Sequence, residues 1–185
     1  EMAGLPLPED DRTSNVAAQQ RKATVDACEV AAGFFVSQLH TKKGAAALHY
    51  IRQRGLSDDV IVDFRLGYAP RSGLFPHLQQ REFSTELVKS AGLVGVSDRD
   101  GSVYDYFRDR LIFPIEDPRG QVIGFGARAL GEVKPKYLNS PESPSFVKKS
   151  VLYGWSRARK AARRGLPVIV VEGYMDVIAV SSSGV

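Results

Sequence analysis

The chain has 185 residues, of which 43% are hydrophobic and 25% are charged, and its formal net charge is +4. This composition is ordinary for a soluble globular protein, and no apolar run approaches the roughly eighteen residues that a membrane-spanning helix needs. The one cysteine, Cys28, excludes an internal disulfide and a zinc site built from cysteines, and it suits a reducing cytoplasm.

The charge is distributed unevenly along the chain. Residues 106–164 hold thirteen Lys and Arg against five Asp and Glu, whereas residues 1–105 and 165–185 are each slightly acidic. A basic block followed by an acidic segment is the electrostatic outline of an enzyme that binds a polyanion beside a metal site. A solvated basic face is the simpler alternative.

A predicted linker precedes a predicted helical platform. Residues 1–14 contain two prolines and several acids, which is typical of a linker. Apolar residues then recur at helical spacing in two segments, and serine N-caps begin two further helices. The predicted helices cover residues 15–40, 42–54, 57–67 and 84–92.

After residue 94 the pattern changes from helices to strands. Residues 111–115 and 122–128 are apolar runs on either side of a turn at Asp117–Gly120, and this predicts a β-hairpin. Gly124 and Gly126, inside the second run, indicate the close approach of another backbone or of a ligand.

A proline-containing loop is predicted over residues 134–150. A loop of this length in a compact domain is more often functional than idle. It mixes cations, an aromatic ring and an amide. Lys136 and Lys148 suit phosphate groups, and Tyr137 and Asn139 suit a base or a sugar.

The last stretch places a carboxylate at the end of a predicted strand. After a basic helix over residues 155–164, the β-branched run Val168–Val171 predicts a strand buried on both faces, as in parallel sheets. Glu172 then occupies the position where ligands collect in α/β sheets, and Asp176 can return there from the next helix. An ordinary strand–turn–helix, whose acid favours the helix N-terminus, explains the same residues.

Several motifs, in family order, resemble bacterial replicative DNA primase over residues 15–185. The final motif alone also resembles the Toprim module that topoisomerases and some nucleases share, whereas the Lys-Tyr-Leu-Asn-Ser-Pro motif is specific to primase. The motifs are Arg54-Gly-Leu-Ser57, Phe107-Arg-Asp-Arg-Leu-Ile-Phe-Pro-Ile115, Gly124-Phe-Gly-Ala-Arg128, Lys136-Tyr-Leu-Asn-Ser-Pro-Glu142, Leu152-Tyr-Gly154 and Glu172-Gly-Tyr-Met-Asp176.

The resemblance implies a fold of the α+β and α/β classes. Residues 15–164 would form the helical and mixed-sheet N-terminal subdomain of the RNA polymerase core. Residues 165–185 would form the first strand and helix of a Rossmann-like Toprim module. The family places a zinc-binding domain before this region and a helicase-binding domain after it. We therefore expect an excised fragment, with zinc bound only in a domain outside this chain.

The resemblance also implies roles for individual residues. Glu172 would belong to the catalytic centre for Mg²⁺ or Mn²⁺ with Asp176 in support, and Lys136 and Lys148 would add catalytic positive charge. The family's metal site also uses an Asp-x-Asp pair on a later strand, and this chain contains no such strand. The groove for nucleic acid or nucleotide would be lined by Arg54, Arg108, Arg110, Arg128, Tyr137 and Asn139.

The implied reaction is the template-directed joining of ribonucleotides into short RNA primers on single-stranded DNA. The expected partners are the template, ribonucleoside triphosphates and, through the C-terminal domain, the replicative helicase. The expected location is the cytoplasmic replication fork, at the nucleoid and away from membranes. We expect the fragment alone to be inactive or nearly so. Two alternatives stay open: a single-stranded DNA-binding module, and a Toprim nuclease or topoisomerase with Tyr174 as the nearest nucleophile.

Overall fold

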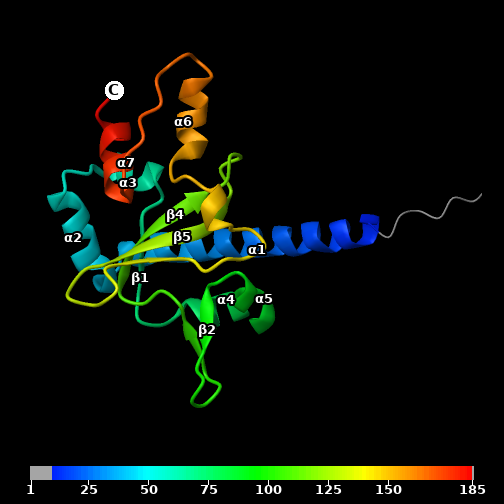
Figure 1. Cartoon of the computed structure of the whole chain (residues 1–185). Coiled ribbons are helices and arrows are strands. Elements are labelled where there is room, and N and C mark those ends of the chain that lie inside the picture. Colours follow the sequence, from blue (N-terminus) through cyan, green and yellow to red (C-terminus); the bar gives the residue numbers. More distant parts are fainter. Residues whose placement is uncertain (1–9, 185) are drawn as a thin grey trace, which may run out of the picture.

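The computed structural model describes residues 10–184, with side chains from residue 14 onward. Helix α1 (Asp10–Leu39) runs across one face of a four-stranded antiparallel sheet, as Figure 1 shows. The α1 helix begins inside the segment predicted as a linker, so that prediction is wrong for residues 10–14, and residues 1–9 lie outside the described part. The strand order is β1 (Gly67–Ala69), β4 (Arg110–Glu116), β5 (Val122–Ala129) and β6 (Tyr137–Asn139).

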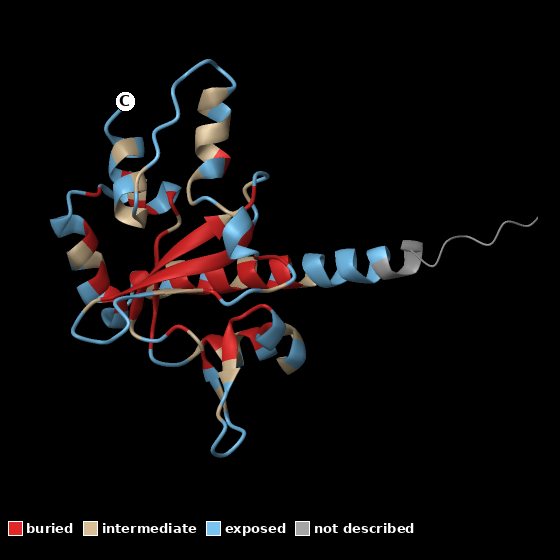
Figure 2. Ribbon diagram, viewed as in Figure 1, coloured by how far each residue is buried: buried red, intermediate tan, exposed pale blue. Residues whose placement is uncertain are grey.

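The second half of α1 forms the centre of the core, whereas residues 14–22 of the same helix are exposed (Figure 2). Small residues such as Ala31 and the buried Cys28 let the helix approach the sheet closely. A side chain at Gly67 would lie 2.6 Å from Phe35 Cβ, so strand β1 can touch the helix only without one. The Phe35 ring packs edge-on against Phe125, with ring centroids 5.3 Å apart.

The predicted hairpin is confirmed as strands β4 and β5. Its register pairs Arg110 with Ala129 at the open end and Glu116 with Val122 at the turn. Asp117 holds the turn, because its Oδ1 accepts hydrogen bonds from the backbone N–H groups of Arg119 at 2.8 Å and Gln121 at 3.1 Å. All of β5 is buried between α1 and the segments that follow the hairpin.

The short helices begin where serine caps predict them. Ser57 accepts from the N–H of Val60 at the start of α3, and Ser84 accepts from Leu87 at the start of α5. The sequence patterns did not predict helix α4, whose N-terminal residue Gly73 offers no side-chain cap, or the two-stranded sheet, whose strands have three residues each. The elements of this region are η1 (Lys42–Gly44), α2 (Ala45–Gln53), α3 (Asp58–Asp63), α4 (Leu74–Gln79), α5 (Thr85–Ser90), β2 (Val94–Val96) and β3 (Val103–Asp105).

The C-terminal segment differs from the predicted strand–turn–helix in its first part. A short 3₁₀ turn, η2 (Lys148–Ser150), precedes α6 (Trp155–Ala162), and α7 (Tyr174–Ser182) follows the predicted turn. Residues 166–171 form no strand, and Val170 is 80% exposed. The prediction of a strand buried on both faces is therefore wrong for the described residues, in which no strand pairs with this run.

The mixed α+β class is confirmed, and both sheets are antiparallel. No helix within residues 10–184 has the length and apolarity of a membrane span.

Candidate nucleic-acid interface

A hollow of about 570 Å³ lies between strand β6, helix α6 and the start of helix α7. It is called the site hollow here. Four predicted site residues line it: Tyr137, Asn139, Glu172 and Asp176. Residues far apart in the sequence therefore meet at one place.

The Tyr174 side chain positions helix α7 on the sheet beside the site hollow. Its ring stacks on Phe113 with centroids 5.1 Å apart and planes 11° apart, and it meets Tyr153 edge-on at 4.8 Å. Its hydroxyl donates to Asn139 Oδ1 at 2.7 Å. The space at Gly126 is filled by this ring rather than by the predicted backbone or ligand. The packing buries most of the Tyr174 side chain, and this burial raises the pKa of its hydroxyl.

The two carboxylates lie at the start of α7. Glu172 lies two residues before the first residue of the helix, Asp176 is in its first turn, and both are exposed at the site hollow. Magnesium prefers carboxylate oxygens and commonly takes one or two of them together with substrate phosphates, so this pair fits one side of such a site. Within residues 10–184, no three or more His, Cys, Asp or Glu side chains come together as metal ligands.

Four side chains beside the site hollow form what is called the Arg–Tyr cluster: Arg54, Tyr50, Arg128 and Tyr137. The guanidinium carbon of Arg128 lies 4.4 Å from the Tyr50 ring centroid and 5.9 Å from that of Tyr137, and the guanidinium carbon of Arg54 lies 5.2 Å from Tyr50. Contacts of this kind fix the positions of the cations without neutralising them. Tyr50 was not predicted, because only the fold brings helix α2 against strand β5.

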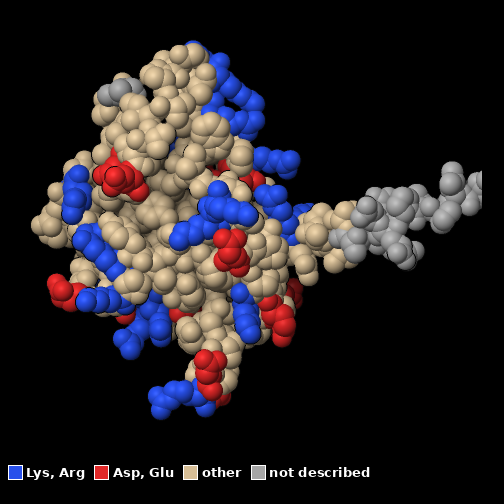
Figure 3. Space-filling view, viewed as in Figure 1, with Lys and Arg blue, Asp and Glu red and all other residues tan. Residues whose placement is uncertain are grey.

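The cluster keeps its positive charge. No carboxylate among the described residues forms an ion pair with Arg54, Arg128 or the neighbouring Lys136. Lysine and arginine side chains also gather over α6 and across the middle of the face in Figure 3. A phosphate group at this end of the hairpin would therefore meet fixed, uncompensated positive charge.

The other predicted cations are placed apart from the cluster. Arg108 lies over the Tyr104 ring at 4.9 Å, next to the small sheet. Lys148 lines a separate shallow hollow with Glu142. Arg110 is only 5% exposed and donates to the Pro135 carbonyl at 2.7 Å, which ties the loop before β6 to strand β4. The predicted contacts of these residues with nucleic acid remain predictions.

Solved structures of the same architecture are catalytic domains of DNA primases. The RNA polymerase domain of Mycobacterium tuberculosis primase, in complex with a double-stranded DNA oligomer that has a 6-nucleotide overhang, is 36% identical with a TM-score of 0.83. That match covers 88% of this chain and 52% of the solved one. A primase catalytic domain bound to single-stranded DNA is 40% identical with a TM-score of 0.79, over 90% of this chain and 54% of that one.

Sequence comparison gives the same result. Residues 34–159 match the family model described as DNA primase catalytic core, N-terminal domain. The DNA primase of Synechococcus elongatus is 45% identical over 90% of this chain and 24% of that protein, and the Halalkalibacterium halodurans enzyme is 39% identical over 99% and 31%. The chain belongs to the family of DNA primase catalytic core, N-terminal domains. It spans about a quarter to a third of these curated relatives.

Proposed function

We propose that this chain forms the template-binding part of a DNA primase that synthesises short RNA primers on single-stranded DNA. Family membership supports the enzyme class. The observation that carries the proposal is the Arg–Tyr cluster, whose uncompensated guanidinium groups adjoin a hollow lined by Glu172. A single strand would place its phosphates on the exposed Arg54 and Lys136 and stack a base on the half-exposed Tyr137 ring. Arg128 is only 9% exposed and would add positive charge from its place between the two tyrosine rings.

Asn139 would read or orient the strand or the nucleotide. Its Oδ1 accepts from Tyr174, so its NH₂ group is the one that remains to donate to a base or sugar oxygen. The Tyr174 ring, fixed by Phe113 and Tyr153, keeps that amide in place. Arg108 and Lys148 would extend the basic surface away from this point, whereas the buried Arg110 would hold the loop before β6 in place.

Magnesium or manganese would be held at the site hollow by Glu172, with Asp176 in support. When bound, the metal would lower the pKa of the attacking hydroxyl and offset the charge that develops on phosphate oxygens. The chain's own residues would bind the template, orient it and supply fixed positive charge, so we expect this chain alone to be catalytically incomplete. For the whole protein, the same proposal includes ribonucleoside triphosphates as substrates and the replicative helicase as a partner. It also includes the cytoplasmic replication fork as the location.

The packing of Tyr174 favours primase over a topoisomerase. A topoisomerase needs a tyrosine hydroxyl free to attack a phosphate, whereas the Tyr174 hydroxyl is bonded to Asn139 and its ring is stacked on Phe113. A DNA-linked covalent adduct that Tyr174→Phe abolishes would reverse this preference.

Glu172→Gln in the intact protein tests the proposal. We expect primer synthesis to fall about 100-fold or more, as on removing one group that stabilises developing charge, while the affinity for single-stranded DNA stays within about 2-fold. Asp176→Asn is the matched control, and we expect a smaller loss. Primer synthesis at the normal rate by the Glu172→Gln protein would refute the proposed role of this carboxylate.

A further inference from the structure

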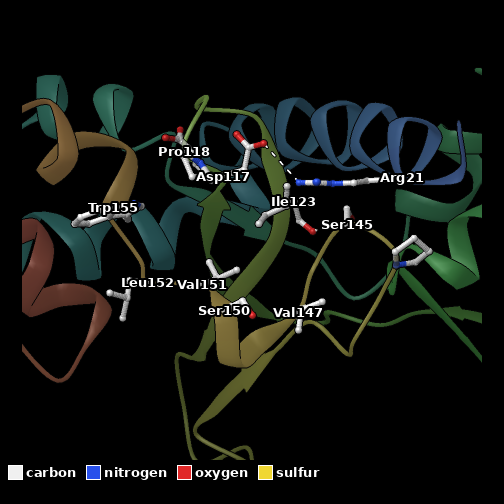
Figure 4. Close-up of a pocket in the computed structure, with 12 residues that line it drawn as sticks. Arg21, Asp117, Pro118, Ile123, Ser145, Val147, Ser150, Val151, Leu152 and Trp155 are labelled. Carbon is white, nitrogen blue, oxygen red and sulfur yellow. Dashed lines mark hydrogen bonds and ion pairs between the residues drawn. The ribbon is translucent and has the colours of Figure 1, made fainter. Parts of the chain in front are cut away.

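Two further hollows continue the site hollow around the molecule. The middle hollow, of about 270 Å³, shares the lining residues Val151, Leu152 and Trp155 with the site hollow. The basic hollow, of about 550 Å³, shares three other lining residues with the middle hollow, among them Arg21 and Asp117. Figure 4 shows Trp155 and Leu152 on one side of the middle hollow and the Arg21–Asp117 pair on another. The three hollows therefore adjoin in series.

Cations from three distant segments line the basic hollow. Arg21 and Lys22 come from α1, Arg119 from the turn between β4 and β5, and Arg159 from α6. The acid that lines it among the described residues is Asp117, whose Oδ1 is occupied by two backbone N–H groups and whose Oδ2 lies 3.8 Å from Arg21.

This arrangement leaves an excess of positive charge in the basic hollow. Lys22, Arg119 and Arg159 form no ion pair within residues 14–184. Convergent, uncompensated cations at a concave surface attract phosphate groups.

The middle hollow offers apolar surface rather than charge. Trp155 is 37% exposed and Leu152 is 64% exposed, although both are large apolar side chains. Trp155 and Arg159 are four residues apart on α6, so they lie on the same face of that helix. An exposed indole followed by a guanidinium on one helix face is suited to a base and to the phosphate next to it.

We propose that a single-stranded nucleic acid passes from the site hollow over Trp155 and places its phosphates on Arg21, Lys22, Arg119 and Arg159. This contact is distinct from the Arg–Tyr cluster. Arg128 lies near the open end of the hairpin and Arg119 in its turn, about 20 Å apart for a seven-residue strand. The identity of the strand, as template or RNA product, rests on the proposed function. The attraction of phosphate groups to the basic hollow does not depend on that function.

Fluorescence of Trp155, the one tryptophan of this chain, tests the path directly. Titration with a 12-nucleotide deoxythymidylate oligomer should quench this fluorescence, because a base would stack on the indole. At about 3.4 Å per nucleotide, the oligomer is long enough to span both ends of the hairpin. The same titration with a 12-nucleotide uridylate oligomer distinguishes the two kinds of strand. Tighter binding of the uridylate oligomer indicates an RNA product, and tighter binding of the deoxythymidylate oligomer indicates a DNA template.

The double variant Arg119→Glu, Arg159→Glu should weaken binding of the preferred 12-mer at least about 10-fold and abolish the quenching. The control is Lys89→Glu, Arg99→Glu, which makes the same change of charge in helix α5 and in the turn between β2 and β3, and it should leave affinity within about 2-fold. In Figure 1 these elements lie on the other side of α1 from the hairpin. Circular dichroism checks that both variants are folded. Equal affinities of the two double variants, or no quenching in the unmodified chain, would overturn the inference.

The inference and the proposed function fail in different ways. If binding depends on Arg128 but not on Arg119 and Arg159, the inference is wrong and the proposed template site stands. If the intact protein makes no primers while binding still depends on Arg119 and Arg159, the proposed function is wrong and the second contact stands.

Discussion

Replacing Gly126 with alanine tests how α7, and with it Glu172, is held on the sheet. A methyl group at this position would lie 2.5 Å from Cε2 of Tyr174 and 2.6 Å from its hydroxyl oxygen, well inside van der Waals contact. The ring cannot turn aside freely, because Phe113 stacks on it and Tyr153 meets it edge-on. The substitution must therefore displace Tyr174 and break its hydrogen bond to Asn139.

The expected cost follows from these contacts. Overpacking a filled site costs about 1–3 kcal/mol, and a lost hydrogen bond adds about 1 kcal/mol. Alanine in a strand is more stabilising than glycine by about 0.5–1 kcal/mol, which offsets part of this cost. We expect the free energy of unfolding to fall by about 1–3.5 kcal/mol. Urea unfolding followed by circular dichroism measures this, and the m-value should not change.

A double-mutant cycle separates the clash from a general effect of the substitution. In a Tyr174→Ala background, Gly126→Ala should cost nearly nothing, because the ring that it meets is gone. Gly131→Ala is the matched control: no heavy atom lies within 4 Å of its added carbon, so its effect should stay within about 0.5 kcal/mol. If Gly126→Ala costs the same with and without the Tyr174 ring, the account of how α7 is anchored is wrong.

Two further predictions concern buried contacts of the core. Partial burial raises the pKa of Glu29, but its hydrogen bonds to Arg65 and to the N–H of Val122 outweigh this and lower the pKa below its ordinary value of 4.5. The stability that the ionised Glu29 adds is therefore complete above pH 4.5 and is lost as the pH falls through the lower pKa of the folded state. Glu29→Gln should destabilise the protein at pH 7 and much less at pH 3. Urea unfolding at both pH values measures this difference. Asp105→Ala should lower the free energy of unfolding by about 2–3 kcal/mol, because this buried carboxylate accepts hydrogen bonds from the first two N–H groups of α4 at 2.8 and 2.9 Å. Asp105→Asn keeps one acceptor oxygen and should cost less. Equal losses of stability for the two variants in thermal unfolding would contradict this account.

Local signals predicted the local structure well. Ser57 and Ser84 cap helices as expected, because a cap is decided by the residue itself and the N–H groups two or three positions later. The hairpin was predictable for the same reason, since a turn between two apolar runs fixes its own pairing. Helix α4 was missed because Asp105, from a distant strand, supplies the acceptor that its own N-terminus lacks.

Predictions that depend on neighbours in space were less accurate. The apolar run Val168–Val171 has the composition of a strand, but a strand also needs a hydrogen-bonding partner, and no described strand lies beside it. Arg110 and Arg128 are equally basic in the sequence. The fold turns Arg110 inward to a carbonyl oxygen and places Arg128 between two tyrosine rings. The sequence did not indicate Tyr50 as a site residue, because its contact with Arg128 depends on where helix α2 packs.

The salt dependence of single-stranded DNA binding tests the central claim, that the surface around the Arg–Tyr cluster binds template phosphates. Lys136 is the residue to change, because its side chain is exposed and has no ion-pair partner among the described residues. Each phosphate contact adds about 0.7 to the slope of log affinity against log salt for a single strand. Lys136→Ala should therefore weaken binding and lower the slope by about 0.7, while Lys89→Ala changes neither. An unchanged slope in Lys136→Ala would contradict the proposed interface.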